Sequence, residues 1–114
     1  MIKKRNEQTK TSEYNSEGKK AFDLYDLSEF EGIKGKIKQF SYVELDEGEE
    51  VPFHVHEGDD ENHYIISGNG IYNDDGEEIY VTEGVITFTP SGHGHALRNT
   101  GVGKLTFIAL VLMR

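Results

Sequence analysis

All five histidines of the chain lie in two short segments, and this spacing could place metal ligands side by side. Residues 52–68, PFHVHEGDDENHYIISG, hold three of them, and residues 90–99, PSGHGHALRN, hold the other two. Imidazole nitrogens bind divalent transition metals, and a carboxylate such as that of Glu61 can join them. The two segments are therefore either halves of one metal site or a coincidence of polar loops.

His54 and His56 stand two positions apart in the stretch HVH. On a β-strand, side chains at this separation point to the same face, so we expect the two imidazoles to lie side by side. Glu61 follows closely, and His95 comes after a predicted sharp turn. If the fold brings the segments together, three imidazoles and one carboxylate converge. Four such ligands on an octahedral ion leave two positions open for water or substrate.

The elements that must position these residues belong to one domain, because the chain has 114 residues. Residues 1–20 are polar and charged, so we expect an N-terminal arm that is mobile or is exchanged with a partner subunit. Residues 21–32 are apolar at three-residue spacing, which leaves a helical turn or an extended strand open, and we favour the extended form. Residues 21–114 form the predicted domain.

From residue 36 onward, short segments rich in β-branched and aromatic residues are bounded by Gly, Asn, Asp or Pro. We expect strands in KIKQFSYVEL, VPFHVH, NHYIISG, GIYN, EEIYV, VITFTP, HALRNT and KLTFIALVLM. The sequence NDDG between two of them predicts a hairpin turn in which Gly76 takes a positive φ. Short strands at regular spacing, without a strongly periodic helix, predict an all-β sandwich or barrel.

The last predicted strand, residues 105–113, is apolar at both odd and even positions. A strand with one face in water carries polar residues at every second position, so the outer face of this strand needs a cover. We expect a homodimer in which a second subunit supplies that cover. The alternative is that the N-terminal arm of the same chain covers it.

Both histidine segments resemble the two sequence motifs of the cupins, a family of small β-barrel proteins. The first motif, G-x5-H-x-H-x(3,4)-E-x6-G, matches residues 48–68, and the second, G-x5-P-x-G-x2-H-x3-N, matches residues 84–99. The matched residues are Gly48, His54, His56, Glu61, Gly68, Gly84, Pro90, Gly92, His95 and Asn99. The resemblance implies a jelly-roll β-barrel, often dimeric through exchange of N-terminal strands.

The resemblance also implies a 3-His-1-Glu site for one divalent transition metal, with the ligands His54, His56, Glu61 and His95. The ion could be Fe, Mn, Ni, Zn, Co or Cu, because affinity alone does not decide which is bound. A cupin that keeps these residues without binding a metal is the alternative. Asp59 and Asp60 are expected in a solvated loop, and the alternative is that they orient an imidazole.

Four further residues are candidates for the surroundings of the ligands or the wall of the pocket. His63 shares the face of Glu61 on a regular strand, and we expect it to line the pocket and bond to a neighbour rather than to bind the metal. His93 is flanked by glycines and is expected at the rim. Phe53 and Tyr64 are expected to pack in the barrel wall more than to contact a substrate.

The composition limits the partners. The net charge is −9, with 21 acidic and 12 basic residues, so we expect no nucleic-acid partner. The longest apolar run is too short to span a bilayer, so we expect no membrane partner. The chain has no cysteine, which excludes thiolate chemistry and fits a cytoplasmic location.

The expected pocket wall is apolar and aromatic, and few arginines are available to hold an anion. Arg98 is expected to point away from the ligands. We therefore expect a small neutral organic substrate rather than a dianion, and a metal-dependent, oxygenase-like enzyme. The alternatives are a non-catalytic binding or sensor protein, and a metal-free isomerase or epimerase in which His54 or His95 is the general base.

Overall fold

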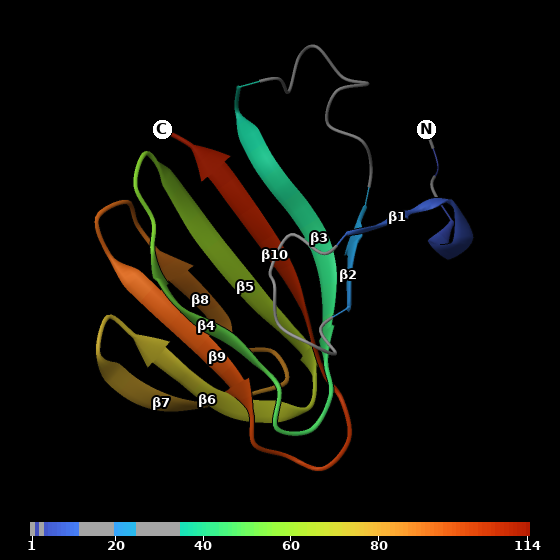
Figure 1. The fold of residues 1–114 in the computed structure, drawn as a ribbon, viewed down its shortest axis with the longest axis vertical. Helices are drawn as coiled ribbons and strands as arrows, with labels where there is room; N and C mark the ends of the chain where they lie inside the picture. Colours follow the sequence, from blue (N-terminus) through green and yellow to red (C-terminus); the bar gives the residue numbers. More distant parts are fainter. Residues whose placement is uncertain (1, 3, 12–19, 25–34) are drawn as a thin grey trace.

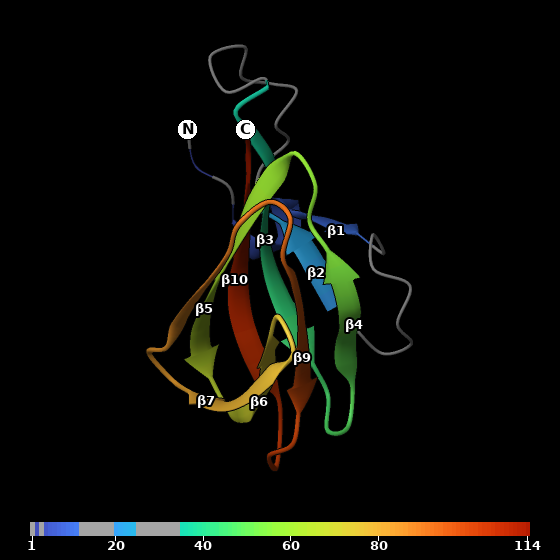
Figure 2. The same cartoon turned by 90° about the vertical axis from the view of Figure 1, so that its left-hand side faces the viewer.

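The computed structural model describes residues 2, 4–11, 20–24 and 35–114, which form two antiparallel sheets (Figure 1). The six-stranded sheet has the order β1-β2-β3-β10-β5-β8, and the four-stranded sheet has the order β4-β9-β6-β7. Figures 1 and 2 show the four-stranded sheet stacked against one face of the larger sheet. The prediction of an all-β jelly-roll is confirmed.

The eight strands β3 to β10 agree with the eight segments predicted from residue 36 onward, while β1 lies in residues 1–20, where an arm and no strand was expected. Their bounds are β1 Thr9–Thr11, β2 Lys20–Asp23, β3 Ile37–Leu45, β4 Glu50–Val55, β5 Asp59–Ser67, β6 Asn69–Asp74, β7 Glu77–Thr82, β8 Ile86–Thr89, β9 Gly94–Asn99 and β10 Leu105–Met113. A short 3-10 helix, η1, spans Arg5–Glu7. In the described part of the chain, no helix is long and apolar enough to cross a membrane.

The core lies between the two sheets. Side chains alternate along β3 and along β10 from Phe107 on, so every second residue there points inward and is buried. The buried apolar residues come from both sheets and are Ala21, Val43, Leu45, Val51, Ile65, Tyr72, Val81, Leu97, Leu105, Phe107 and Ala109. This packing fixes the strands that carry the histidines.

The described part of the N-terminal arm lies against the sheet of its own chain. β1 pairs with β2, and β2 pairs with β3, so residues 9–11 and 20–23 extend the six-stranded sheet. The guanidinium of Arg5 lies 4.1 Å from the ring centroid of Tyr42, a cation–π distance. The extended form that we favoured for the start of residues 21–32 is found in β2, while residues 25–34 lie outside the described residues. Exchange of the arm between subunits stays a prediction.

The turn between β6 and β7 has the conformation predicted from NDDG. Asp74 pairs with Glu77, so Asp75 and Gly76 form a two-residue loop. Their φ angles are 51° and 104°, and two consecutive positive φ values are typical of the hairpin turn that matches strand twist. The carboxylate of Asp75 also accepts a hydrogen bond from the backbone of Gly94, which ties this turn to β9.

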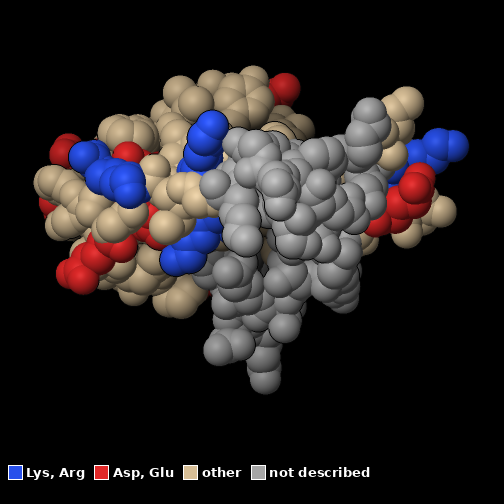
Figure 3. Space-filling model, turned by 90° about the horizontal axis from the view of Figure 1, so that it is seen from above, with Lys and Arg blue, Asp and Glu red and all other residues tan. Residues whose placement is uncertain are grey.

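Charged side chains are mixed on the face of the molecule shown in Figure 3. Acidic and basic groups lie beside one another over the described residues of this face. The described residues of this face therefore form no continuous basic surface of the kind that binds phosphate backbones, in line with the net charge of −9.

Candidate metal centre

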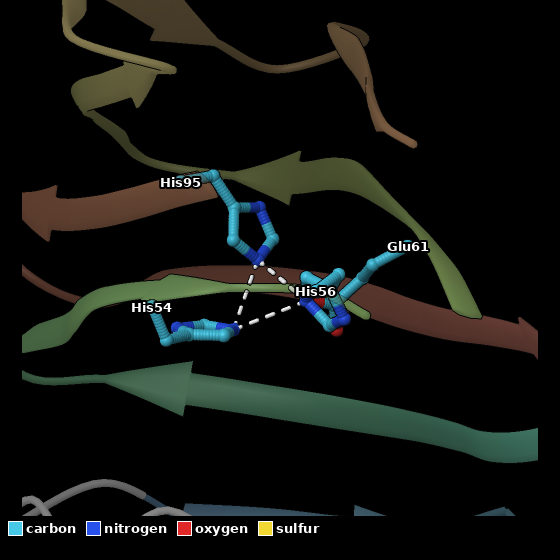
Figure 4. A group of neighbouring side chains, drawn as sticks. All are labelled: His54, His56, Glu61 and His95. Atoms are coloured by element: carbon cyan, nitrogen blue, oxygen red, sulfur yellow. Dashed lines mark hydrogen bonds and ion pairs between the residues drawn. The ribbon is translucent and has the colours of Figure 1, made fainter. Parts of the chain in front are cut away.

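Three imidazoles and one carboxylate meet between the two sheets (Figure 4). His54 lies in β4, His56 directly follows that strand, Glu61 lies in β5 and His95 lies in β9. His54 and His95 are direct cross-strand partners, which brings the two histidine-rich segments into register. His56, Glu61 and His95 are buried, while the side chain of His54 is 32% exposed, so the group is reached from its His54 side.

The three imidazoles of this group present the same nitrogen to a common point. The Nε2 atoms of His54, His56 and His95 are each 3.1 Å from the other two. Oε1 of Glu61 lies 2.9 Å from Nε2 of His56, 2.7 Å from Nε2 of His95 and 3.8 Å from Nε2 of His54. Four ligand atoms therefore surround one small volume.

The hydrogen bonds on the opposite nitrogens direct the lone pairs of His54 and His56 inward. Nδ1 of His54 lies 2.8 Å from the carbonyl oxygen of Pro52, which can only accept, so Nδ1 carries the proton. Nδ1 of His56 likewise donates to Oδ1 of Asp59 at 2.7 Å. When both imidazoles are neutral, two unprotonated Nε2 atoms face each other at 3.1 Å. This repulsive arrangement requires a cation or an added proton between them.

His95 is oriented by two hydroxyl groups. Its Nδ1 lies 2.7 Å from the hydroxyl of Tyr72 and 3.1 Å from that of Thr89, and these two hydroxyls bond to each other. A metal on Nε2 requires the proton on Nδ1, where either oxygen accepts it. Tyr72 and Thr89 were not among the candidates from the sequence, because only strand register places them beside His95.

The separations between the four ligand atoms are short enough for one ion to be bound by all of them. Ligands about 2.1 Å from an ion are about 3.0 Å apart at right angles and about 3.4 Å apart in a tetrahedron. Five separations lie between 2.7 and 3.1 Å, and one, between Glu61 and His54, is 3.8 Å. Five of the six are therefore shorter than those of tetrahedral ligands, and an ion bound in this way would have room for further ligands.

The electrostatics of the group suit metal binding. Burial raises the pKa of Glu61, but the nearby imidazoles of His63, His54 and His56 outweigh it and hold that pKa well below its ordinary value. Burial lowers the pKa of His95 to about 4. A hydrogen bond to Glu61 raises the pKa of His56, against the opposing effect of burial. Near pH 7 Glu61 is therefore ionised and His95 neutral, while the proton of His56 competes with a metal.

The family model described as a cupin domain matches residues 41–111, more than half of the chain. This match, together with the converged group, decides the family. The chain belongs to the cupins. The four residues of the 3-His-1-Glu arrangement form one cluster that could hold a metal ion.

A curated protein and a crystal structure, both from Thermotoga maritima, resemble this cupin over most of its length. A protein named oxalate-binding protein is 33% identical over 96 residues, which cover 84% of this chain and 79% of the relative. A crystal structure described as a predicted oxalate decarboxylase covers 100% of both chains, with a TM-score of 0.87 and 28% identity. An RmlC-like cupin from Shewanella frigidimarina, 17% identical, shares the fold with a TM-score of 0.78 over 99% of this chain and 90% of its own.

In this cupin, His63 is a buried neighbour of the cluster, as the sequence indicated. Its Nε2 lies 3.4 Å from Oε2 of Glu61, and its ring packs 4.6 Å from that of Phe107, measured between centroids. Its Nδ1 is buried without a hydrogen-bond partner among the described residues. His63 is outside the group of four whose atoms converge.

The other three candidates lie on the surface, away from the cluster. His93 is at the rim, where its Nδ1 lies 2.9 Å from Oδ2 of Asp75 and both side chains are exposed. Phe53 alternates with His54 along β4, and Tyr64 alternates with His63 along β5, so both point outward. They are 50% and 48% exposed, which corrects the expectation that they line the pocket.

Asp59 and Lys38 lie beside the cluster, although the sequence analysis expected Asp59 in a solvated loop and did not single out Lys38. Asp59 is buried, not solvated, and its two oxygens bond to Nδ1 of His56 and Nζ of Lys38. A cavity of about 370 Å³ adjoins the cluster, lined by Lys38, Gln39, His54, Val55, His56, Glu57, Asp59 and Val111. Six of these eight residues are polar, so the expected apolar and aromatic pocket is wrong for this cavity. Arg98 points away into another surface depression, as expected.

Proposed function

We propose that this cupin holds one divalent transition metal ion per chain through His54, His56, Glu61 and His95. The observation that carries the proposal is the set of three Nε2 atoms at 3.1 Å from one another. In His54 and His56 the ring proton is on Nδ1, which leaves the lone pair of Nε2 free to bind a metal. The donor set admits Fe, Mn, Ni, Zn, Co or Cu. Bound there, the ion would supply a Lewis-acid centre for ligand oxygens.

We further propose that the ligand is oxalate or a similarly small carboxylate. The cavity next to His54 and His56 is polar and contains Lys38, whose ammonium group suits an anionic ligand. The names given to the Thermotoga maritima protein and to the Thermotoga maritima crystal structure point to the same class of ligand. We therefore place carboxylate binding ahead of the oxygenase-like activity on a neutral substrate that the sequence favoured.

Isothermal titration of oxalate into the metal-loaded and metal-free protein tests this function. We expect saturable binding of about one oxalate per chain to the loaded form and a loss of at least tenfold in affinity without metal. Acetate, which has one carboxylate, is the control and should bind far more weakly. Equal binding of oxalate to both forms would contradict the proposal. Oxygen uptake by the Fe-loaded form with a neutral phenol or diketone would favour the oxygenase-like enzyme instead.

We also propose a homodimer formed through the outer face of the six-stranded sheet. Tyr42, Ile108, Tyr64 and Ile86 are successive cross-strand partners on β3, β10, β5 and β8. Buried neighbours on either side of Tyr42 and Tyr64 show that this row faces outward. Tyr64 is 48% and Ile86 66% exposed, while Arg5 of the same chain covers the ring of Tyr42 at the other end of the row. Exposed apolar side chains such as Tyr64 and Ile86 are typical of an interface.

Replacing Ile86 by lysine should convert the dimer to a monomer, because a charge would be buried in the proposed interface. Sedimentation velocity at micromolar concentration measures the change. Tyr80→Lys is the matched control, since Tyr80 is 60% exposed on β7 of the other sheet and should leave the dimer intact. A monomeric unmodified chain at the same concentration would overturn this proposal.

A further inference from the structure

Lys38 is set apart from the regular pairing of β3 by a β-bulge. Val111 of β10 pairs with Gln39, and the next residue, Leu112, pairs with Ile37, so Lys38 is the extra residue of β3. A bulge leaves one residue without a partner and redirects its side chain out of the alternating pattern. This bulge lies at the end of β3 that borders the cavity beside the four candidate metal ligands.

The redirected side chain reaches the rim of that cavity. Nζ of Lys38 lies 3.2 Å from Oδ2 of Asp59, whose other oxygen accepts the Nδ1 proton of His56. Asp59 is buried and fixed by His56, so it holds the lysine ammonium in a defined place. The side chain of Lys38 is 57% exposed, which leaves its remaining N–H donors available to a second acceptor.

The ammonium group of Lys38 differs in charge from the other side chains around the cavity. Among the described residues that line the cavity, Lys38 is the one lysine or arginine, and its neighbours include the carboxylates of Glu57 and Asp59. Asp59 is engaged through both oxygens. A ligand with a single anionic end at the metal would leave the ammonium unused, whereas a ligand with a second anionic group could reach both.

We propose that Lys38 determines specificity for a dianionic ligand, by donating a hydrogen bond to the carboxylate that lies farther from the metal. This inference rests on the proposed function, because the nearer carboxylate is placed at the cluster. It also replaces the expectation that a dianionic substrate is disfavoured. That expectation did not foresee that the bulge in β3 would direct Lys38 toward the cavity. Lys38 is a binding residue here and Asp59 is its positioning residue.

Titration of oxalate and of oxamate, its monoanionic analogue, into metal-loaded Lys38→Gln tests the proposal. We expect about tenfold weaker binding of oxalate, little change for oxamate, and an unchanged metal content of one ion per chain. Lys38→Arg should recover most of the oxalate affinity because it keeps the charge. Lys104→Gln is the matched control, since Lys104 also pairs with one carboxylate, Glu44 at 2.9 Å, but does not line the cavity.

The outcomes separate this inference from the function on which it rests. No oxalate binding by the unmodified, metal-loaded chain would contradict the proposed function itself. Oxalate binding that Lys38→Gln leaves unchanged would contradict only the role of Lys38. A loss of metal together with oxalate would also overturn it, because Lys38 would then act on His56 through Asp59 instead of on the ligand.

Discussion

Replacing His56 by alanine should lower the metal content from one ion per chain to below about a tenth of an equivalent. Nε2 of His56 lies within 3.1 Å of the other three ligand atoms. Without it, two imidazoles and one carboxylate remain, and Asp59 loses the proton donor that it binds. Elemental analysis after reconstitution and removal of free metal measures the loss.

His93→Ala is the control for this variant. It also removes one imidazole from a histidine-rich segment, but His93 is an exposed rim residue whose partner is Asp75. Its metal content should equal that of the unmodified chain. Equal metal contents in the two variants would refute the assignment of ligands. If His56→Ala does not fold, His54→Ala serves in its place, because the side chain of His54 is already 32% exposed.

Gly68→Ala should destabilise the fold by about 3 kcal/mol, the second large effect that we expect. Gly68 has a φ of 87°, and a Cβ there would clash with the carbonyl oxygen of Lys104 and lie 2.8 Å from Cα of Leu105. Both atoms belong to the backbone, so neither can move without displacing the start of β10. Backbone strain and overpacking therefore add, and urea unfolding of the metal-free protein measures their sum.

Gly84→Ala separates the two contributions. Gly84 has a nearly identical φ of 86°, but nothing lies within 4 Å of a Cβ placed there. Only the strain of the left-handed conformation remains, so we expect a loss of about 1 kcal/mol. Equal losses at the two glycines would show that the close contact with Lys104 and Leu105 is not what Gly68 provides.

The strands could be predicted from the sequence because they depend on local spacing. Alternation likewise places His54 and His56 on one face, whereas the resemblance to the cupin motifs is what implied that Glu61 and His95 join them. The turn at Asp75 and Gly76 follows from two adjacent residues that tolerate a positive φ. The strands, the HVH pair and the turn each need only a few neighbouring residues.

The surroundings of the cluster could not be predicted, because they depend on register between distant strands. Lys38 meets Asp59 across 21 positions only because β3 contains a bulge, and nothing in the letters KIKQF marks that irregularity. The contact of Tyr72 in β6 with His95 is likewise not indicated by any local sequence pattern. The prediction of an apolar pocket was wrong for the same reason. The alternation within a strand shows which residues point inward, but not which residues of other strands lie beside them.

The metal content of the unmodified chain tests the central proposal most directly. The purified protein is analysed for transition metals as isolated, and again after incubation with Mn²⁺, Fe²⁺, Ni²⁺ or Zn²⁺ and removal of free ions. With three Nε2 atoms and Glu61 directed at one point, we predict about one equivalent of metal per chain with at least one of these ions. Less than about a tenth of an equivalent with every ion would contradict the account.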